Sequence, residues 1–173
     1  EKRSLPQLSI IIPLPLPQNL KICYKNSMFA LAETLEEERL THAANTAIEH
    51  KARLGQYFTP YPIARFMATL FPVTDQKIRL LDPGAGIGAL SCTFLERIRQ
   101  ENWETPEVLV SVYDIDESVL QTLEKNVAYA CACFNKADYE IFSEDFLIKT
   151  AFEYTWNINK TYTHVIMNPP YKK

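Results

Sequence analysis

The stretch IRLLDPGAGIGAL, residues 78–90, constrains the fold more than any other part of the chain. The chain contains four glycines, and Gly84, Gly86 and Gly88 lie at alternate positions in this stretch. The apolar run before them is typical of a buried strand, and the residues after them favour a helix. Glycine permits a tight turn and lets a ligand approach the backbone closely. The order strand, glycine-rich turn and helix therefore predicts a nucleotide cradle rather than a simple turn.

Strand and helix patterns alternate from residue 78 to the end. We expect strands at 78–82, 108–114, 139–145 and 163–168, and helices at 88–100 and 117–134. This alternation predicts an α/β fold with a parallel sheet covered on both faces.

The N-terminal part has a different pattern. Residues 1–26 alternate proline with apolar residues, which predicts an extended arm lying on another surface. Residues 27–54 predict a helix with the charge run EEER on its solvated face. Its expected inward-facing residues are Leu31, Leu35, Ala44, Ala47 and Ile48. In residues 55–75, Thr59 is the expected N-cap and Pro60 the first-turn proline of a helix that ends near Phe71.

Charge and cysteine content exclude several classes of protein. The net charge is −3, so no strongly basic surface indicates nucleic-acid binding, which would need a local patch or a further region. No apolar run is long enough to span a bilayer, and prolines interrupt the one at residues 10–12. The four cysteines form no Cys-x-x-Cys pair, so we expect reduced thiols in a cytoplasmic protein. Cys131 and Cys133 are expected to pack as small apolar residues of a helix.

The glycines alone do not identify the ligand. Gly84, Gly86 and Ala89 also satisfy the G-x-G-x-x-G/A pattern of dinucleotide enzymes. Asp114, at the end of the second strand, can accept both ribose hydroxyls of either NAD or S-adenosylmethionine. Asp145 can accept from an adenine amino group and Phe146 can pack on the ring, but a helix N-cap and a core phenylalanine explain them equally well.

The segment NPPY, residues 168–171, favours one chemistry. An amino group attached to a flat ring is a poor nucleophile because its lone pair is delocalised. Acceptors on its two N–H bonds, here the Asn168 side-chain oxygen and the Pro169 carbonyl, can free that lone pair, and the prolines restrict the direction of the carbonyl. Tyr171 can stack on a flat substrate. Catalysis would then rest on positioning and electrostatics, without a covalent enzyme intermediate or a metal.

DPGAGIGAL, YDIDE, SEDFL and NPPY, in this order, resemble the motifs of amino-group methyltransferases. LGQYFTPYPIARFM ahead of them resembles the additional cofactor motif of γ-class N6-adenine DNA methyltransferases, including the PstI/BsuBI-like group of type II restriction–modification systems. The resemblance covers about residues 50–173. It implies a Rossmann-like fold, S-adenosylmethionine as cofactor, and double-stranded DNA with a flipped adenine as substrate.

The resemblance also implies roles for individual residues. Expected cofactor-binding residues are Phe58, Thr59, Pro60, Asp82, Gly84, Ala85, Gly86, Gly88, Asp114, Ile115, Asp145 and Phe146. Expected catalytic residues are Asn168, Pro169, Pro170 and Tyr171. We expect two parts, an N-terminal arm and helix at 1–54 and a catalytic domain at 55–173. We also expect a cytoplasmic protein that is not bound to a membrane.

The family continues beyond NPPY, through further strands and a target recognition domain. We therefore expect a truncated domain with an open sheet edge, inactive alone and prone to self-association. A cognate restriction endonuclease is a possible partner. Alternative functions are a protein glutamine methyltransferase acting on release factors, an rRNA guanine-amino methyltransferase and a non-catalytic cofactor-binding subunit. The segment GQYFTP favours the DNA class over the glutamine class, and intact Asn168 and Tyr171 argue against the non-catalytic subunit.

Overall fold

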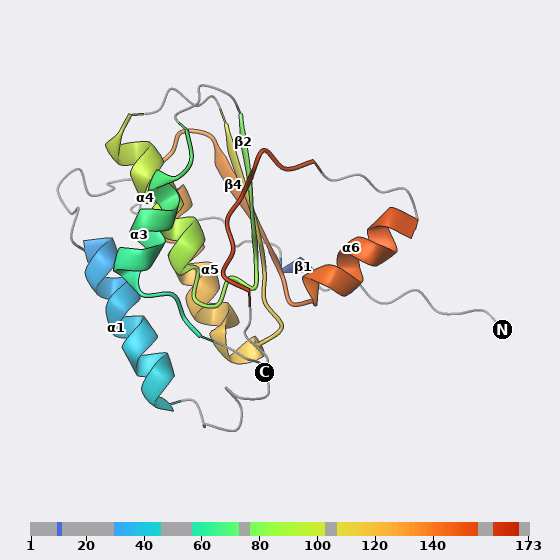
Figure 1. Cartoon of the computed structure of the whole chain (residues 1–173), viewed down its shortest axis with the longest axis horizontal. Coiled ribbons are helices and arrows are strands. Elements are labelled where there is room, and N and C mark those ends of the chain that lie inside the picture. Colours follow the sequence, from blue (N-terminus) through green and yellow to red (C-terminus); the bar gives the residue numbers. More distant parts are fainter. Residues whose placement is uncertain are drawn as a thin grey trace.

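The structure is a computed structural model that describes residues 10–11, 30–45, 57–72, 77–102, 107–155 and 161–169. In these ranges, the chain forms a sheet with helices α1, α3, α4 and α5 on one side and α6 on the other (Figure 1). The predicted α/β fold is therefore confirmed. Among the described residues, no helix combines the length and the apolar character needed to cross a membrane.

The described strands form one sheet in the order β1-β4-β3-β2-β5. Their bounds are β1 Ile10–Ile11, β2 Ile78–Pro83, β3 Val108–Tyr113, β4 Ala137–Phe142 and β5 His164–Val165. β2, β3, β4 and β5 are parallel, and β1 pairs antiparallel with β4. The pairing of β1 agrees with the prediction of an extended N-terminal arm for the two arm residues that are described.

The register aligns the carboxyl ends of the three central strands. Pro83 lies opposite Tyr113, and Tyr113 lies opposite Phe142. The loops that follow β2, β3 and β4 therefore leave the same edge of the sheet. Ligands of open α/β sheets bind at this edge.

The main core lies between the sheet and the helices α4, Ala89–Gln100, and α5, Glu117–Cys131. Alternate strand residues such as Leu80 and Val110 face these helices and are fully buried. On the opposite sheet face, Tyr113 stacks on Phe142 with ring centroids 4.4 Å apart. Phe146, at the start of α6, Phe146–Thr155, meets the edge of the Tyr113 ring.

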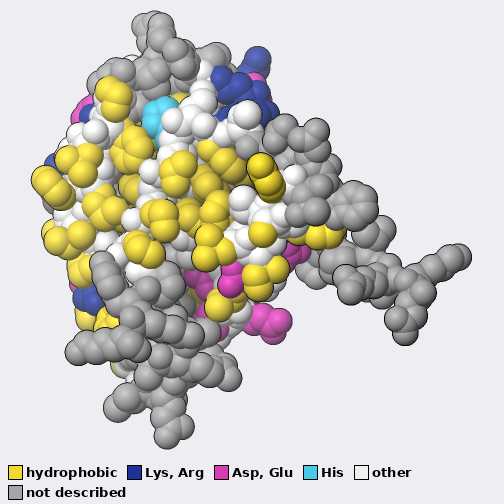
Figure 2. All heavy atoms as spheres, turned by 45° about the vertical axis from the view of Figure 1, so that its right-hand side comes forward, with side chains coloured by type: hydrophobic (Ala, Val, Ile, Leu, Met, Phe, Trp, Pro, Cys, Tyr) yellow, Lys and Arg dark blue, Asp and Glu magenta, His cyan; other side chains and the backbone are white. Residues whose placement is uncertain are grey.

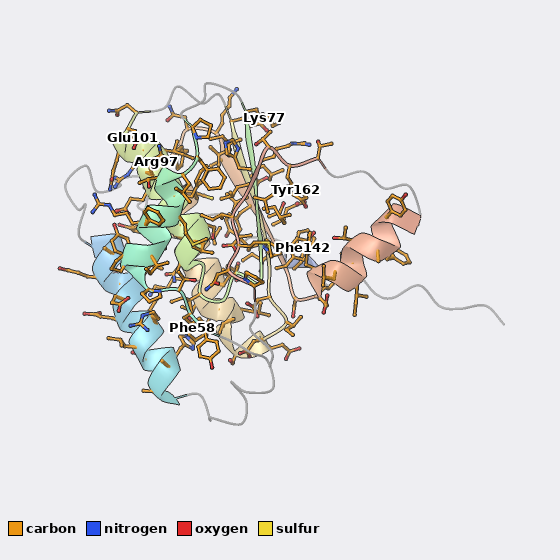
Figure 3. All side chains as sticks on the ribbon, in the orientation of Figure 1. Phe58, Lys77, Arg97, Glu101, Phe142 and Tyr162 are labelled. Atoms are coloured by element: carbon orange, nitrogen blue, oxygen red, sulfur yellow. The ribbon has the colours of Figure 1, made fainter. Side chains whose placement is uncertain are left out.

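Helix α3, Tyr61–Thr69, is held against α4 at both ends. At its start the Tyr61 hydroxyl donates to Glu96 over 2.9 Å. At its end the Arg97 guanidinium donates to the carbonyls of Ala68 and Phe71, the latter over 2.7 Å. Figure 3 shows Arg97 beside this end of α3, next to its ion-pair partner Glu101. These bonds hold both ends of α3 against α4.

Helix α1, Ala30–Asn45, confirms part of the helix predicted at 27–54. Leu35 is buried, as expected, but Ala44 is exposed, so that prediction was wrong. The charge run is not purely solvated, because Glu38 accepts from both Lys125 and Asn126 of α5. Ala47 and Ile48 lie outside the described residues.

Other boundaries differ from the predictions for local reasons. The strand expected at 139–145 begins at 137 and ends at 142, because Asp145 opens helix α6, which was not predicted. Helix α5 ends at Cys131, so the buried thiol of Cys131 belongs to the helix and Cys133 follows it. The strand expected at 163–168 is limited to β5. Pro60, not Thr59, is the N-cap of α3.

Candidate active site

A pocket of about 390 Å³ lies at the carboxyl edge of the sheet. Segments from five parts of the chain line it. They are Tyr57–Thr59, Pro83–Ile87 with Ala89 and Leu90, Tyr113–Ile115, Glu144–Leu147, and Met167–Pro169. The pocket therefore brings together the motifs that follow β2, β3, β4 and β5.

The glycine turn, residues 83–88, forms the floor of the pocket. Gly84, Gly86 and Gly88 all have positive φ angles, between 58° and 84°, which other residues rarely adopt. The space where a Gly84 side chain would lie is open, so a ligand can approach that backbone. A Cβ on Gly86 would lie 2.9 Å from the Phe58 ring, so this glycine is also required for close packing.

Phe58 covers the glycine turn and is itself supported from α1 and α5. Its ring centroid is 5.9 Å from that of His42, whose Nε2 lies 3.1 Å from the Thr122 hydroxyl. Figure 3 shows Phe58 near the start of α3. This packing links the segment before α3 to the floor of the pocket.

Asp114 joins the glycine turn to β3. Its Oδ2 accepts from the Gly86 N–H over 2.6 Å, and its Oδ1 accepts from the Asp116 N–H over 2.9 Å. Burial raises the pKa of this carboxyl, while the backbone donors act to lower it. A carboxylate has about four lone-pair sites, so these two bonds leave acceptor capacity for a ligand.

Asp82 lies beneath the turn and is fully buried. Its Oδ2 accepts from the Ser91 N–H over 3.2 Å, and its Oδ1 has no hydrogen-bond partner among the described residues. Burial raises the pKa of Asp82 to about 7. Asp82 does not line the pocket, so its place is structural support of the turn.

Asp145 lies at the rim and is exposed. Its Oδ1 accepts from the N–H groups of Leu147 and Ile148 over 2.8 Å and 3.1 Å, so it caps α6. Both Asp145 and Phe146 also line the pocket. Asp145 therefore caps α6 and Phe146 packs in the core. Both residues also lie in the pocket where adenine contacts were expected.

Thr59 and Asn168 meet across the pocket. The Asn168 Nδ2 donates to the Thr59 hydroxyl oxygen over 3.0 Å, although the two residues are 109 positions apart in sequence. Thr59 is buried and Asn168 is half-buried. This contact joins a predicted cofactor residue to a predicted catalytic one.

The structure brings most of the predicted site residues to the pocket. Phe58, Thr59, Gly84, Ala85, Gly86, Asp114, Ile115, Asp145, Phe146, Asn168 and Pro169 line it, whereas Pro60, Asp82 and Gly88 do not. Pro170 and Tyr171 lie outside the described residues. Further lining residues lie within or beside the quoted motifs but were not assigned a role individually. They are Tyr57, Pro83, Ile87, Ala89, Leu90, Tyr113, Glu144, Leu147 and Met167. Their closeness to predicted residues is the signal that could have found them.

The family described as N-6 DNA Methylase matches residues 38–173. The chain belongs to this family. The match confirms the resemblance expected from the motifs and does not favour the release-factor, rRNA or non-catalytic alternatives. Members of a methylase family use a methyl donor, so a nicotinamide ligand is not favoured either.

Several type II methyltransferases are similar to this methylase chain. M.BsuBI of Bacillus subtilis is 34% identical over 84% of this chain and 30% of its own length. M.PstI of Providencia stuartii is 25% identical over 79% of this chain and 28% of its own length. M.AccI of Acinetobacter calcoaceticus is 26% identical over 76% of this chain and 21% of its own length. The chain therefore spans less than a third of the length of these relatives.

The methylase pocket has the size of a small-ligand site. Its volume lies within the usual range for small-ligand sites, which is roughly 300–1,000 Å³. Among its lining residues in the described ranges, Asp114, Glu144 and Asp145 are acidic and none is Lys or Arg. Such a lining is compatible with a cationic ligand.

Proposed function

We propose that this chain carries the cofactor-binding and catalytic segments of an adenine-N6 DNA methyltransferase from a restriction–modification system. One observation carries the proposal. The glycine turn, Asp114 and the Asn168–Pro169 segment line a single pocket, and Asn168 is hydrogen-bonded to Thr59 of the segment ahead of the turn. The parts expected to hold the methyl donor therefore adjoin the part expected to hold the target amino group.

The proposed cofactor is S-adenosylmethionine, which when bound supplies an electrophilic methyl group on a sulfonium. The open side of Gly84 admits a ligand to the backbone, and Asp114 accepts the ribose hydroxyls. Ile115 and Phe146 offer apolar surface to the adenine, and Asp145 accepts from its amino group. Thr59 donates to the methionine carboxylate.

The proposed chemistry places two acceptors on the target amino group. Asn168 Oδ1 and the Pro169 carbonyl each accept one N–H, which localises the lone pair on nitrogen. The bound cofactor would supply the methyl group to that nitrogen and leave as the neutral thioether, and the proton released from the nitrogen would pass to solvent. Tyr171 stacks on the flipped adenine. Preorganised acceptors of this kind stabilise charge that develops in the transition state.

The proposed partners follow from the same function. The substrate is double-stranded DNA with one adenine flipped into the pocket, and a cognate restriction endonuclease acts on the same DNA sequence. The proposed cellular location is the cytoplasm. We also propose that the catalytic domain begins at residue 55, after the N-terminal arm and helix. We also propose self-association of the isolated chain through the edge strand β5, where Val165 is 48% exposed.

The test is product analysis with the full-length natural protein. The protein is incubated with methyl-labelled S-adenosylmethionine and DNA of mixed sequence, and the DNA is digested to nucleosides for mass spectrometry. We expect the label in N6-methyladenine. Label in a glutamine of added release factor, or in a guanine of added rRNA, with none in DNA would contradict the proposal.

A further inference from the structure

The contact between Thr59 and Asn168 has a consequence for the orientation of the Asn168 amide. An asparagine amide carries an acceptor, Oδ1, and a donor, Nδ2, at nearly equal distances from Cγ. The target amino group requires an acceptor. A reversed Asn168 amide would instead point its own N–H groups at the N–H groups of the target. Whatever fixes the amide therefore decides whether Asn168 can assist the reaction.

The Thr59 hydroxyl occupies a firmly held position. Thr59 is 7% exposed and directly precedes Pro60, whose carbonyl accepts from Ile63 and Ala64 in the first turn of α3. Helix α3 is in turn bound to α4 at both ends, by Tyr61 and by Arg97. The Thr59 hydroxyl therefore adjoins the start of a helix that is held at both ends.

The Asn168 segment lies at the edge of the sheet. It follows the two-residue strand β5, and the neighbouring Met167 is 42% exposed. The 3.0 Å bond from Nδ2 to Thr59 ties this segment to the start of α3. With Nδ2 on Thr59, Oδ1 lies on the other side of the amide.

We infer that Thr59 is a positioning residue for Asn168: its hydroxyl oxygen accepts from Nδ2 and thereby keeps Oδ1 as the atom that meets the target amino group. This inference rests on the proposed function and adds a role for Thr59 beyond cofactor binding. A threonine hydroxyl has one proton and two lone pairs, so accepting from Asn168 leaves the proton for a second partner. When that proton is donated to another acceptor, the oxygen can only accept, and the reversed amide orientation becomes unfavourable.

The experiment compares Thr59→Val, which removes the hydroxyl at nearly constant volume, with Thr59→Ser, which retains it. In the 173-residue chain, NMR follows the side-chain amide signals of Asn168, assigned through Asn168→Ala. We expect Thr59→Val to shift these signals and to speed their proton exchange, and Thr59→Ser to keep both near wild type. Unchanged signals in Thr59→Val would overturn the inference. Thermal unfolding of each variant checks that the fold is retained.

A kinetic arm separates positioning from cofactor affinity. In the full-length natural protein, single-turnover rates are measured at saturating S-adenosylmethionine, and cofactor affinity is measured separately by calorimetry. We expect Thr59→Val to lower the saturated rate about ten-fold or more, and Thr59→Ser to restore most of it. A rate loss in Thr59→Val that saturating cofactor fully removes would show that Thr59 acts on cofactor binding alone and would overturn the inference.

The two arms also distinguish failure of the inference from failure of the proposed function. A wild-type protein that forms no N6-methyladenine refutes the function. The NMR experiment then still tests the contact between Thr59 and Asn168. Changed Asn168 amide signals in Thr59→Val, with wild-type signals in Thr59→Ser, support the contact. Identical spectra of all three proteins overturn it.

Discussion

Asp114 and Asp145 follow neighbouring strands of the same sheet, yet their surroundings differ. Asp114 is 7% exposed and accepts from Gly86 in the glycine turn, so it belongs to the buried floor of the pocket. Asp145 is exposed and accepts from the first turn of α6, where Leu147 is 75% exposed. The floor is therefore held by buried hydrogen bonds before any ligand binds, whereas the contacts described at the rim include the Asp145 helix cap, the Lys149–Glu144 ion pair and the Asn168–Thr59 hydrogen bond.

Hydrophobic side chains gather on the face of the molecule that comes forward in Figure 2. The exposed apolar residues of α6 and β5 include Leu147, Ile148, Tyr154 and Val165. The floor, in contrast, lies above the continuous core of β2, β3, α4 and α5. From this difference we propose that floor residues contribute most to cofactor affinity and that Asn168, on the other side of the pocket, contributes most to methyl transfer.

The largest expected effect is at the rim. Asn168→Ala should lower the single-turnover rate of methyl transfer by on the order of 100- to 1,000-fold or more, because it removes an acceptor that acts in the transition state. Cofactor affinity should remain nearly unchanged. Asn135→Ala, the same substitution at an exposed position after α5, is the matched control. A near-normal rate in Asn168→Ala would show that the NPPY mechanism is wrong.

The next effect is at the floor. Asp114→Ala should weaken S-adenosylmethionine binding by about ten-fold or more, because a hydrogen bond to a charged group contributes roughly 1.5–3 kcal/mol. Asp138→Ala, at an exposed position on β4, controls for the loss of a carboxylate. A demethylated cofactor analogue without ribose hydroxyls sharpens the test. Wild type should bind it more weakly than the parent compound, while Asp114→Ala should not distinguish the two.

A smaller effect is expected from Asp145→Ser. Serine is a good N-cap, so α6 should stay intact while the carboxylate leaves the pocket, and cofactor affinity should fall only a few-fold. Asp145→Ala should in addition lose about 1 kcal/mol of stability, because the cap is removed. Equal cofactor affinity in all three proteins would show that Asp145 serves only as the helix cap.

The smallest functional effect, with a distinct pH signature, is expected from Asp82→Asn. Burial raises the folded-state pKa of Asp82 from 3.8 to about 7, so the folded protein holds this proton more tightly than the unfolded chain. The resulting stability is fully present below about pH 4 and is lost as pH rises through about 7.

Urea unfolding over this pH range tests the effect in the isolated chain. The free energy of unfolding of Asp82→Asn, relative to wild type, should rise from about pH 4 to about pH 8, because the variant has no carboxyl to ionise. Asp138→Asn is the matched control. Parallel pH profiles for wild type and Asp82→Asn would contradict the assignment.

The floor could be predicted from sequence and the rim only in part. The bounds of β2, α4 and β3 differ from the predictions by one residue at most, because continuous apolar runs and three glycines mark them. Helix α6 was missed because its apolar residues Leu147 and Ile148 are exposed and give no inward-facing period. Thr59 was expected to cap α3, but a tertiary partner 109 positions away takes its hydroxyl instead.

The central claim is that the pocket above the glycine turn is built for S-adenosylmethionine. Isothermal titration calorimetry of the 173-residue chain with S-adenosylmethionine, its demethylated product and NADH tests it most directly. We predict saturable one-to-one binding of the first two, lost on Asp114→Ala, and no binding of NADH. Tight binding of NADH without binding of S-adenosylmethionine or its product would contradict the account.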